Sequence, residues 1–255
     1  MGTIRRISRF FLVCTMFLGL HGYSFAQIPP IEMIYVEGST FTRGCVPKAG
    51  YECENNDELP AYKVTVNSFY IAKYPVTQAL WKAVMGKNPS KFEGDDLPVE
   101  NVSWNDAQEF IRKLNTQTGK TYRLPTEAEW EFAARGGVKS QGYIYSGSDT
   151  ADEVAWYIEN SGNKTHPVGL KKANELGIYD MNGNVHEWCN DWYNTYNSMR
   201  SQTNNPQGLS RGTDRVFRGG SWEGYDIFVT IAFREHDRPN VRLDNLGFRL
   251  ASTTE

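Results

Sequence analysis

Three short helix signals follow one another between residues 77 and 136, and this pattern sets the main limit on the fold. They cover 77–86, 105–119 and 126–136, and each ends at a glycine. In the third, Thr126 and Glu129 have the spacing of a capping box, in which each side chain accepts from the other residue's backbone N–H. Beyond residue 136 the pattern is mostly short and irregular, so the sequence favours a fold without long regular elements.

Alternating apolar and polar residues predict strands on both sides of these helices. Two runs precede them, at 33–41 and 62–71, and three follow near the C-terminus, at 216–222, 228–234 and 247–251. The chain also has 23 Gly beside 7 Trp and 14 Tyr, which indicates many loops held together by aromatic packing. We therefore expect one α+β domain that is loop-rich and has little regular secondary structure.

Length and composition exclude several classes of protein. With 255 residues, of which 40% are hydrophobic and 22% charged, the chain can bury a substantial core and does not resemble a disordered protein. A formal net charge of −3 leaves no basic footprint for DNA or RNA. No nucleic-acid partner is expected.

The first residues have the pattern of a secretory signal. Three arginines precede an apolar run at 10–20, and a small-x-small cleavage site ends at Ala26. The alternative is a membrane anchor, but a helix that spans a bilayer needs about 20 apolar residues and this run is shorter. We therefore divide the chain into a signal peptide, 1–26, and a mature domain without a membrane span, 27–255, which is secreted or periplasmic.

An oxidising compartment changes what the cysteines can do. Cys45 and Cys53 bracket a short polar loop and would be able to pair there, the alternative being two unpaired surface thiols. Cys189 lies between large aromatic residues, where a small buried thiol is commoner than a nucleophile. The sequence therefore predicts a disulfide between Cys45 and Cys53.

Charged residues are dense around the third helix signal. Arg123 and Arg135 flank Glu127, Glu129 and Glu131. These residues are predicted to form a network of ion pairs at the helix ends. Exposed pairs of this kind contribute roughly 0–1 kcal/mol each.

Six segments together resemble the formylglycine-generating enzyme family, also called the sulfatase-modifying factor family. The most specific are TYRLPTEAEWEFAARGG at 121–137, GIYDMNGNVHEWCNDWY at 177–193, RVFRGGSW at 215–222 and GFRL at 247–250. Segments 64–81 and 98–110 extend the resemblance to nearly all of the mature chain. It implies a C-type-lectin-like α+β domain, in agreement with the loop-rich fold expected above.

One motif within this resemblance suggests a calcium ion. Asp180 and Glu187 supply carboxylates, and the turn between them exposes backbone carbonyls, which together are the oxygen ligands that calcium prefers. The resemblance implies a structural calcium held by Asp180, Glu187 and the carbonyls of Gly183 and Val185. The alternative is a carboxylate that caps a buried turn without metal.

A second family calcium site corresponds to Ala155, Asn160 and Gly162. This chain departs from the family pattern there, because Asn160 stands where the family can have an aspartate.

The catalytic pattern of the family is missing. Members that oxidise a sulfatase cysteine to formylglycine bind copper through a cysteine pair, and by family spacing that pair corresponds to Gly224 and Val229. Thiolates suit this role because soft sulfur selects Cu(I). No cysteine occurs between Arg218 and Glu255, and Cys189 lies outside that segment. We therefore assign no catalytic residue and expect no copper.

Segment 223–246 lies between two family motifs and mixes acidic, basic, aromatic and aliphatic residues. In the family this stretch lines the substrate cleft, and loops on a rigid scaffold are where binding usually occurs. The alternative is an ordinary strand-loop-strand without a ligand. The residues predicted to line the cleft and to bind an unidentified protein or peptide are Ser221, Trp222, Tyr225, Phe228, Arg234 and Arg242.

These observations support three functional hypotheses. The first is a secreted, calcium-stabilised, monomeric binding or accessory module that uses this cleft. The second is a sulfatase-maturation oxidase with an altered active site. The third is a variable ligand-binding protein of the kind encoded by diversity-generating retroelements, in which the corresponding C-terminal segment is the binding surface.

Overall fold

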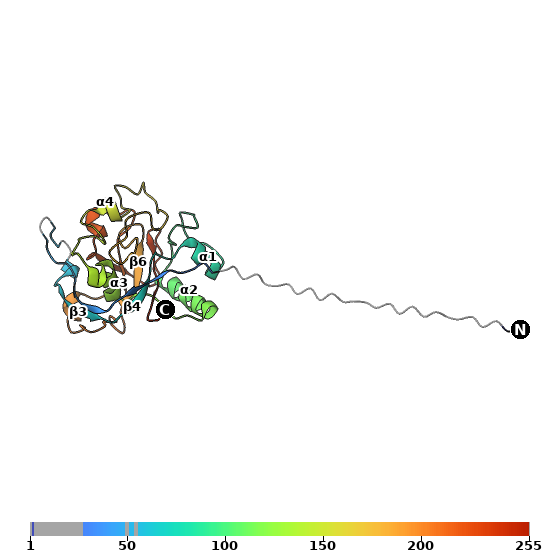
Figure 1. Ribbon diagram of the computed structural model, residues 1–255, viewed down its shortest axis with the longest axis horizontal. Coiled ribbons are helices and arrows are strands. Elements are labelled where there is room, and N and C mark those ends of the chain that lie inside the picture. Colours follow the sequence, from blue (N-terminus) through green and yellow to red (C-terminus); the bar gives the residue numbers. More distant parts are fainter. Residues whose placement is uncertain (1, 3–27, 49–50, 54–55, 255) are drawn as a thin grey trace.

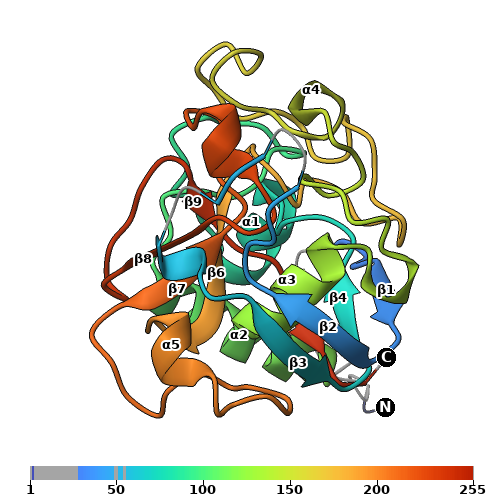
Figure 2. The ribbon, with the colours of Figure 1, turned by 90° about the vertical axis from the view of Figure 1, so that its left-hand side faces the viewer.

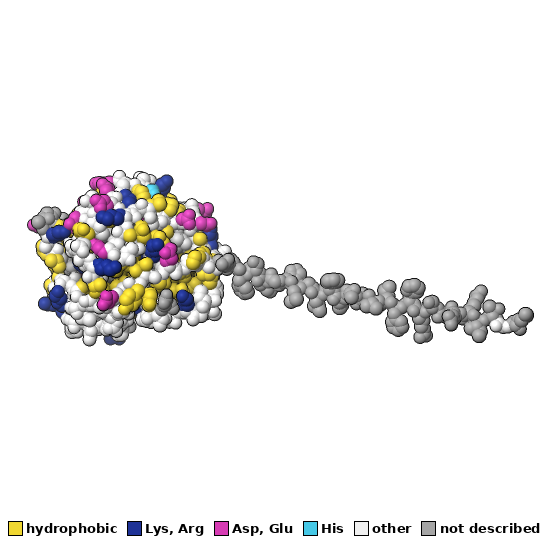
Figure 3. Space-filling view, in the orientation of Figure 1, with side chains coloured by type: hydrophobic (Ala, Val, Ile, Leu, Met, Phe, Trp, Pro, Cys, Tyr) yellow, Lys and Arg dark blue, Asp and Glu magenta, His cyan; other side chains and the backbone are white. Residues whose placement is uncertain are grey.

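The computed structural model describes residue 2 and residues 28–48, 51–53 and 56–254. Apart from Gly2, the predicted signal peptide lies outside these residues, and so does its cleavage site. Within the described residues, no helix combines the length and the apolar character needed to cross a membrane. They form a mixed α/β fold with short elements connected by many loops (Figure 1), and side chains of both charges are spread over the face shown in Figure 3.

One four-stranded antiparallel sheet joins the two ends of the described chain. Its strand order is β1 (Met33–Val36), β4 (Phe69–Ala72), β10 (Ala251–Ser252) and β5 (Tyr122–Arg123). Beside it, β2 (Ser39–Arg43) and β3 (Tyr62–Val66) form a separate antiparallel pair.

A second four-stranded sheet carries the residues that matter for function. Its order is β8 (Arg234–Asp237), β7 (Arg215–Arg218), β6 (His186–Trp192) and β9 (Leu246–Gly247). The pairs β8–β7 and β7–β6 are antiparallel, whereas β6–β9 is parallel.

Side chains alternate between the two faces of this sheet. Arg218 is paired with Glu187 on one side and with Arg234 on the other, so these three side chains share one face. Phe217 is paired with Glu235, and that pair lies on the opposite face.

The predicted helices are present, with one shifted start. α1 (Gln78–Met85) is capped by Thr77, and α3 (Glu127–Ala134) has the predicted Thr126–Glu129 capping box. α2 (Trp104–Thr118) begins one residue before the predicted start at Asn105. Its cap is Ser103, because the Ser103 hydroxyl accepts from the N–H of Asp106 while the Asp106 carboxylate accepts from the N–H of Ser103. The remaining helical segments are single turns: α4 (Ala151–Val154), α5 (Tyr196–Met199), and the 3-10 turns η1 (Asn56–Glu58), η2 (Gly137–Lys139) and η3 (Asp226–Val229).

All three predicted C-terminal strands differ from the structure. The run at 247–251 is divided between β9 and β10, which belong to different sheets. The strand predicted over 216–222 ends at Arg218, because Gly219 and Gly220 both have positive φ, at 95° and 68°. The run at 228–234 begins in η3, and the strand itself is β8, at 234–237.

Helix α3 lies at the centre of the molecule, in contact with β2, β3, β6 and β7 (Figure 2). Trp130 and Phe132 are buried in its core, together with residues of all these strands. A second core surrounds the stacked rings of Trp81 and Phe110, which lie 5.2 Å apart at the centroids. Aromatic packing therefore holds the loop-rich fold together, as composition predicted.

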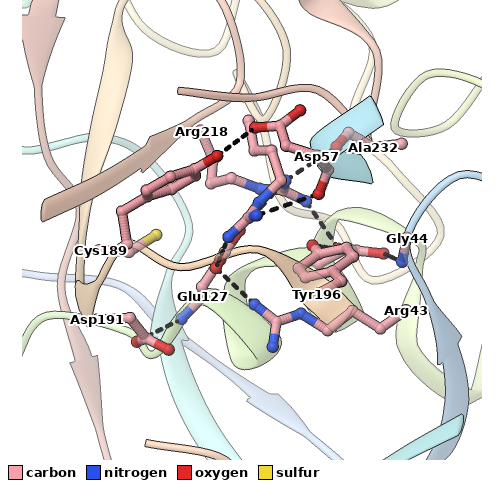
Figure 4. Close-up of polar contacts among 12 residues, drawn as sticks. Arg43, Gly44, Asp57, Glu127, Cys189, Asp191, Tyr196, Arg218 and Ala232 are labelled. Carbon is pink, nitrogen blue, oxygen red and sulfur yellow. Dashed lines mark hydrogen bonds and ion pairs between the residues drawn. The ribbon is translucent and has the colours of Figure 1, made fainter. Parts of the chain in front are cut away.

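Helix α3 also brings two carboxylates into the core. Glu127 accepts hydrogen bonds of 2.8 Å from both the Nε and the Nη2 of Arg234, and it forms an ion pair of 2.5 Å with Arg43. Glu131 forms ion pairs with Arg135 at 2.7 Å and Arg218 at 2.8 Å. Figure 4 shows the guanidinium groups of this buried cluster around Glu127.

This cluster corrects the prediction of ion pairs at the helix ends. The pair Arg123–Glu129 does lie near the helix start, at 2.7 Å. Glu127 and Glu131, however, are 0% exposed, and most of their partners come from β2, β7 and β8.

The cysteines are arranged as predicted. Cys45 and Cys53 are joined in a disulfide, with their Cα atoms 5.7 Å apart. Cys189 is free and fully buried, and burial raises the pKa of its thiol well above the ordinary value.

Candidate functional site

A cavity of about 300 Å³ lies on one face of the second sheet, where β6, β8 and the segment after β7 meet. We call it the Ser221 cavity. Its lining is His186, Ser221, Glu223, Gly224, Phe228, Phe233, Glu235, Leu243 and Asn245. A larger hollow of about 470 Å³ adjoins the disulfide loop, but that loop includes residues 49–50, which the structure does not describe. The Ser221 cavity is bounded by described residues alone.

The alternation of side chains along β6 and β8 explains why His186 and Glu235 both line the cavity. His186 on β6 lies two residues before Trp188, which is paired with Phe217, and Phe217 is paired in turn with Glu235. His186 and Glu235 therefore point to the same side of the sheet, while Arg234 points into the core. The rings of His186 and Phe217 meet edge-on, with centroids 5.0 Å apart.

Two glycines turn the chain into the cavity wall after β7. Gly220 has φ 68°, and a Cβ built on it would lie 2.3 Å from the carbonyl oxygen of Phe228. No side chain fits at that distance, so only glycine allows the segment 221–224 to approach η3. This approach puts Ser221 and Phe228 in one wall.

A short chain of hydrogen bonds crosses the cavity lining. Asn245, which precedes β9, donates from Nδ2 to Glu223 Oε1 at 2.6 Å and to Ser221 Oγ at 3.4 Å. The Asn245 side-chain oxygen is buried without a hydrogen-bond partner among the described residues. Ser221 is 0% exposed, so its hydroxyl belongs to the inner part of the lining.

His186 and Glu235 form the other polar part of the lining. Their closest atoms, His186 Nε2 and Glu235 Oε2, are 3.6 Å apart. Burial lowers the pKa of His186 to about 3, so the imidazole is neutral at neutral pH. The Glu235 side chain is 46% exposed. Its partial burial and the nearby carboxylates of Asp57, Glu223 and Asp237 raise its pKa.

Exposed apolar side chains occur in the cavity lining and next to it in the sequence. Tyr225 is 60% exposed, Leu243 39% and Ile227 37%, which makes them three of the seven exposed large hydrophobic residues in the described part of the chain. Tyr225 and Ile227 flank the start of η3, next to Phe228, and the rings of Phe228 and Phe233 are 5.2 Å apart. Exposed apolar groups gathered around a hollow are typical of an interaction site.

The structure brings together only part of the predicted cleft. Ser221 and Phe228 line the cavity, whereas Tyr225 is exposed and follows the lining residue Gly224 in the sequence. Trp222 is buried beside it, where its indole packs against Phe92 and donates to the carbonyl of Asp244 at 3.2 Å.

The two arginines of the predicted cleft do not line this cavity. Arg234 lies in the buried cluster with Glu127, because β8 starts at 234 and alternation turns that side chain inward. Arg242 forms an exposed pair with Asp106, at the start of α2, at 2.7 Å. Neither Arg234 nor Arg242 therefore lines the Ser221 cavity, contrary to the prediction.

Sequence reasoning did not find His186, Glu223, Glu235 or Asn245 as cavity residues. Glu235 would have followed from alternation if the strand had been placed at 234–237 instead of 228–234. The others come from three separate segments that meet only in the folded chain.

The cavity residues do not fit a copper ion. The two positions that correspond to the family's cysteine pair hold Gly224, which lines the cavity, and Val229, which is fully buried. The single free cysteine of the described chain, Cys189, belongs to the α3 core. Cu(I) needs soft ligands, and the cavity lining offers only oxygen and nitrogen donors.

At the first predicted calcium site, the carboxylate of Glu187 is paired with the guanidinium group of Arg249. Glu187 accepts from Arg249 through both carboxylate oxygens, at 2.6 Å from Nε and 2.7 Å from Nη2, and also from Trp130 Nε1 at 2.7 Å. Asp180 accepts from the N–H of Gly169 at 2.7 Å, and burial raises its pKa to about 6. Arg249 already supplies the positive charge beside Glu187, so these donors do not fit calcium.

At the second predicted calcium site, the side chain of Asn160 is already engaged in hydrogen bonds. Asn160 donates from Nδ2 to the carbonyl of Ala155 at 3.0 Å and to Asp152 Oδ1 at 3.1 Å. Its Oδ1 accepts from the N–H of Tyr157 at 3.0 Å. The amide of Asn160 thus occupies the oxygens that a cation would need. Calcium binding at either site remains a prediction from the family resemblance. The arrangement of the side chains at the two sites does not support it.

Comparison with known proteins agrees with this fold. A family model described as "Sulfatase-modifying factor enzyme 1-like domain" matches residues 24–254. The chain is 39% identical over 241 residues to the "Chaperone protein LppX" of Paenibacillus barcinonensis, a match that covers 75% of this chain and 78% of that protein. It is 35% identical to the formylglycine-generating enzyme of Bos taurus, covering 88% of this chain and 75% of the enzyme.

Longer proteins and a solved structure extend the comparison. The chain spans only 38% of the "Serine/threonine-protein kinase pkn1" of Chlamydia pneumoniae, at 31% identity over 86% of this chain. The solved structure of Treponema denticola variable protein 1 superposes with a TM-score of 0.77 at 32% identity, covering 87% of this chain and 95% of that one. The chain belongs to the formylglycine-generating enzyme, or sulfatase-modifying factor, family.

Proposed function

We propose that this chain is a secreted binding or accessory module of its family, which holds a segment of a partner protein in the Ser221 cavity. The observation that carries the proposal is a set of three exposed apolar side chains in and next to that cavity, which we call the apolar rim. Leu243 lines the cavity, and Tyr225 and Ile227 are adjacent in sequence to the lining residues Gly224 and Phe228. The hollow is at the small end of the range for ligand pockets, roughly 300–1,000 Å³. It therefore suits one or two side chains of an extended segment whose neighbours rest on the apolar rim.

Two relatives support a binding role. The relative named a chaperone is 39% identical to this chain. The solved structure with a TM-score of 0.77 is that of a protein described as variable. A chaperone acts by holding parts of other proteins, so an accessory role fits the exposed rim.

The donor chemistry of the cavity argues against a copper oxidase. Gly224 and Val229 supply no thiolate where the family's copper site would lie, and the remaining donors are hard. Incubation of the pure chain with copper, oxygen and a peptide that carries the sulfatase motif is expected to leave the peptide mass unchanged. Conversion of its cysteine to formylglycine would restore the oxidase hypothesis.

The rim provides the test of the binding proposal. Reduced α-lactalbumin, which aggregates when its disulfides are lost, serves as the unfolded probe, and light scattering measures its aggregation. We expect the chain to suppress this aggregation, and the double variant Tyr225→Ser, Leu243→Ser to lose most of the effect. Because both side chains are exposed, the variant should keep its melting temperature.

A matched control separates the rim from surface hydrophobicity in general. Tyr35 and Leu170 are 54% and 62% exposed and do not line the Ser221 cavity. The double variant Tyr35→Ser, Leu170→Ser should suppress aggregation as well as the unmodified chain. Equal loss in both double variants, or no suppression by the unmodified chain, would refute the proposal.

A further inference from the structure

We propose that the Ser221 cavity contains a subsite for a protonated basic side chain, lysine or arginine, of the bound segment. This inference rests on the proposed function and adds the chemical class of the residue that enters the cavity. It is carried by the geometry of the lining, which holds a buried amide oxygen without a hydrogen-bond partner and two carboxylates without an ion pair to lysine or arginine.

The amide of Asn245 supplies an unused acceptor. The residue is 6% exposed, and its Oδ1 has no hydrogen-bond partner among the described residues. The orientation of the amide follows from chemistry, because Nδ2 lies 2.6 Å from Glu223 Oε1 and a carboxylate can only accept. A buried acceptor without a hydrogen bond destabilises the fold, so this position favours a ligand that donates.

Two carboxylates face the cavity without a cationic partner. Glu223 and Glu235 line it, no lysine or arginine does, and neither carboxylate has an ion pair with a lysine or arginine of the described chain. The nearby Lys91 is paired with Asp244, at 2.5 Å. His186 makes no hydrogen bond to Glu235, because its Nε2 lies 3.6 Å from Glu235 Oε2.

The acidic surroundings of Glu235 extend beyond the cavity. Asp57 and Asp237 lie close enough to raise its pKa, and His236 close enough to lower it. His236 is itself 3.0 Å from Asp214. The local charge is therefore negative at neutral pH, and a cation entering the cavity would relieve the repulsion between these carboxylates.

The apolar part of the lining suits the stem of a long basic side chain. Phe228, Phe233 and Leu243 form this part, and the two phenyl rings lie 5.2 Å apart. Lysine and arginine bury their methylene stems against such surfaces, and their charged groups are attracted to aromatic faces. A bare metal ion would gain nothing from these contacts, and the described residues contain no cluster of three metal-ligating side chains.

A pair of matched peptides tests the subsite. The probes are two fluorescein-labelled heptapeptides, Gly-Leu-Phe-X-Phe-Leu-Gly, in which X is lysine or its uncharged analogue norleucine. Fluorescence anisotropy measures both affinities for the full mature chain. We expect the lysine peptide to bind at least tenfold more tightly, and this advantage to shrink in high salt because charge pairs are screened.

Variants of the two carboxylates assign the effect to the cavity. Glu223→Gln and Glu235→Gln keep the side-chain volume, and together they should bring the lysine peptide to the affinity of the norleucine peptide. The readout is the ratio of the two peptide affinities in each variant. Glu109→Gln is the matched control, because Glu109 is an exposed carboxylate on α2 that pairs with Arg112 at 2.8 Å, and it should preserve the tenfold preference.

The outcomes separate the two proposals. Equal affinity for both peptides in the unmodified chain would overturn the basic subsite and leave the binding role standing. A lysine preference that persists in the double variant would also overturn it, since the charge would then act elsewhere. Failure of both peptides to bind would overturn the binding role and the subsite together.

Discussion

Replacing Glu127 with glutamine tests how the buried arginine cluster stabilises the fold. The substitution keeps the shape of the side chain and removes its charge. In the native chain Glu127 is 0% exposed, accepts twice from Arg234 at 2.8 Å and pairs with Arg43 at 2.5 Å. Arg218 lies 3.5 Å away. A neutral amide would leave three buried guanidinium groups with only part of their counter-charge.

The expected cost is large for a single substitution. Breaking a buried ion pair by removing one partner costs about 3–5 kcal/mol, because the remaining charge stays buried. Here three arginines lose a partner, while Arg218 keeps Glu131 at 2.8 Å. In a domain of this size each kcal/mol lowers the melting temperature by roughly 2–4 °C, so the variant should melt roughly 6–20 °C lower.

Thermal unfolding followed by circular dichroism at pH 7 measures this difference. The control is Glu109→Gln, an exposed carboxylate whose pair with Arg112 contributes at most about 1 kcal/mol. A loss of less than about 1 kcal/mol in Glu127→Gln, equal to that of the control, would refute the reasoning. Such a result would mean that Glu131 and the buried tyrosines alone compensate the positive charge of the arginines.

The acid limb of the stability curve provides an independent check. The three guanidinium groups outweigh burial and hold the pKa of Glu127 well below its usual range. A carboxyl with a lowered folded pKa adds stability above its unfolded pKa, about 4.3, and loses it as pH falls. The unmodified chain should therefore lose stability below pH 4 more steeply than Glu127→Gln does.

Three further predictions concern other parts of the molecule. Burial raises the pKa of Asp191 to about 7, so its stabilising contribution is present at pH 4 and lost as pH rises through 7; Asp191→Asn should flatten urea-unfolding stability between pH 5 and 8, and an unchanged slope would contradict this. Since Arg249 occupies the carboxylate of Glu187, EDTA followed by excess calcium should leave the melting temperature unchanged, and a rise with calcium would restore the predicted metal site. Gly220→Ala should cost about 2 kcal/mol or more, because φ is 68° and the new methyl meets a carbonyl oxygen at 2.3 Å; a near-neutral result in urea unfolding would show that the wall of the cavity can shift.

Sequence patterns between neighbouring residues predicted the parts of the fold that depend on short-range interactions. The Thr126–Glu129 capping box and the glycine stops depend on residues a few positions apart, so they can be read along the chain. The disulfide needed only two cysteines at the ends of one short loop. The family motifs then gave the architecture, because they cover nearly all of the mature domain.

Contacts between distant segments explain what could not be predicted. Glu127 and Arg234 are 107 positions apart, and nothing in either segment indicates that they meet in the core. An arginine in a mixed loop segment looks like a surface residue until the register of β8 is known, which is why Arg234 was assigned to the cleft. The same register decides that Glu235, one position later, faces the cavity.

The place of β10 in the first sheet has a consequence for the order of folding. Ala251 and Ser252 lie between β4 and β5, so the strands at 69–72 and 122–123 are joined only through residues near the end of the described chain. A ribosome delivers these residues after β4 and β5, and long-range pairings of this kind are slow to form. Until β10 is made, β4 and β5 expose unpaired edges to other chains. A protein with this topology depends on β10, or on a chaperone, to protect those edges during synthesis.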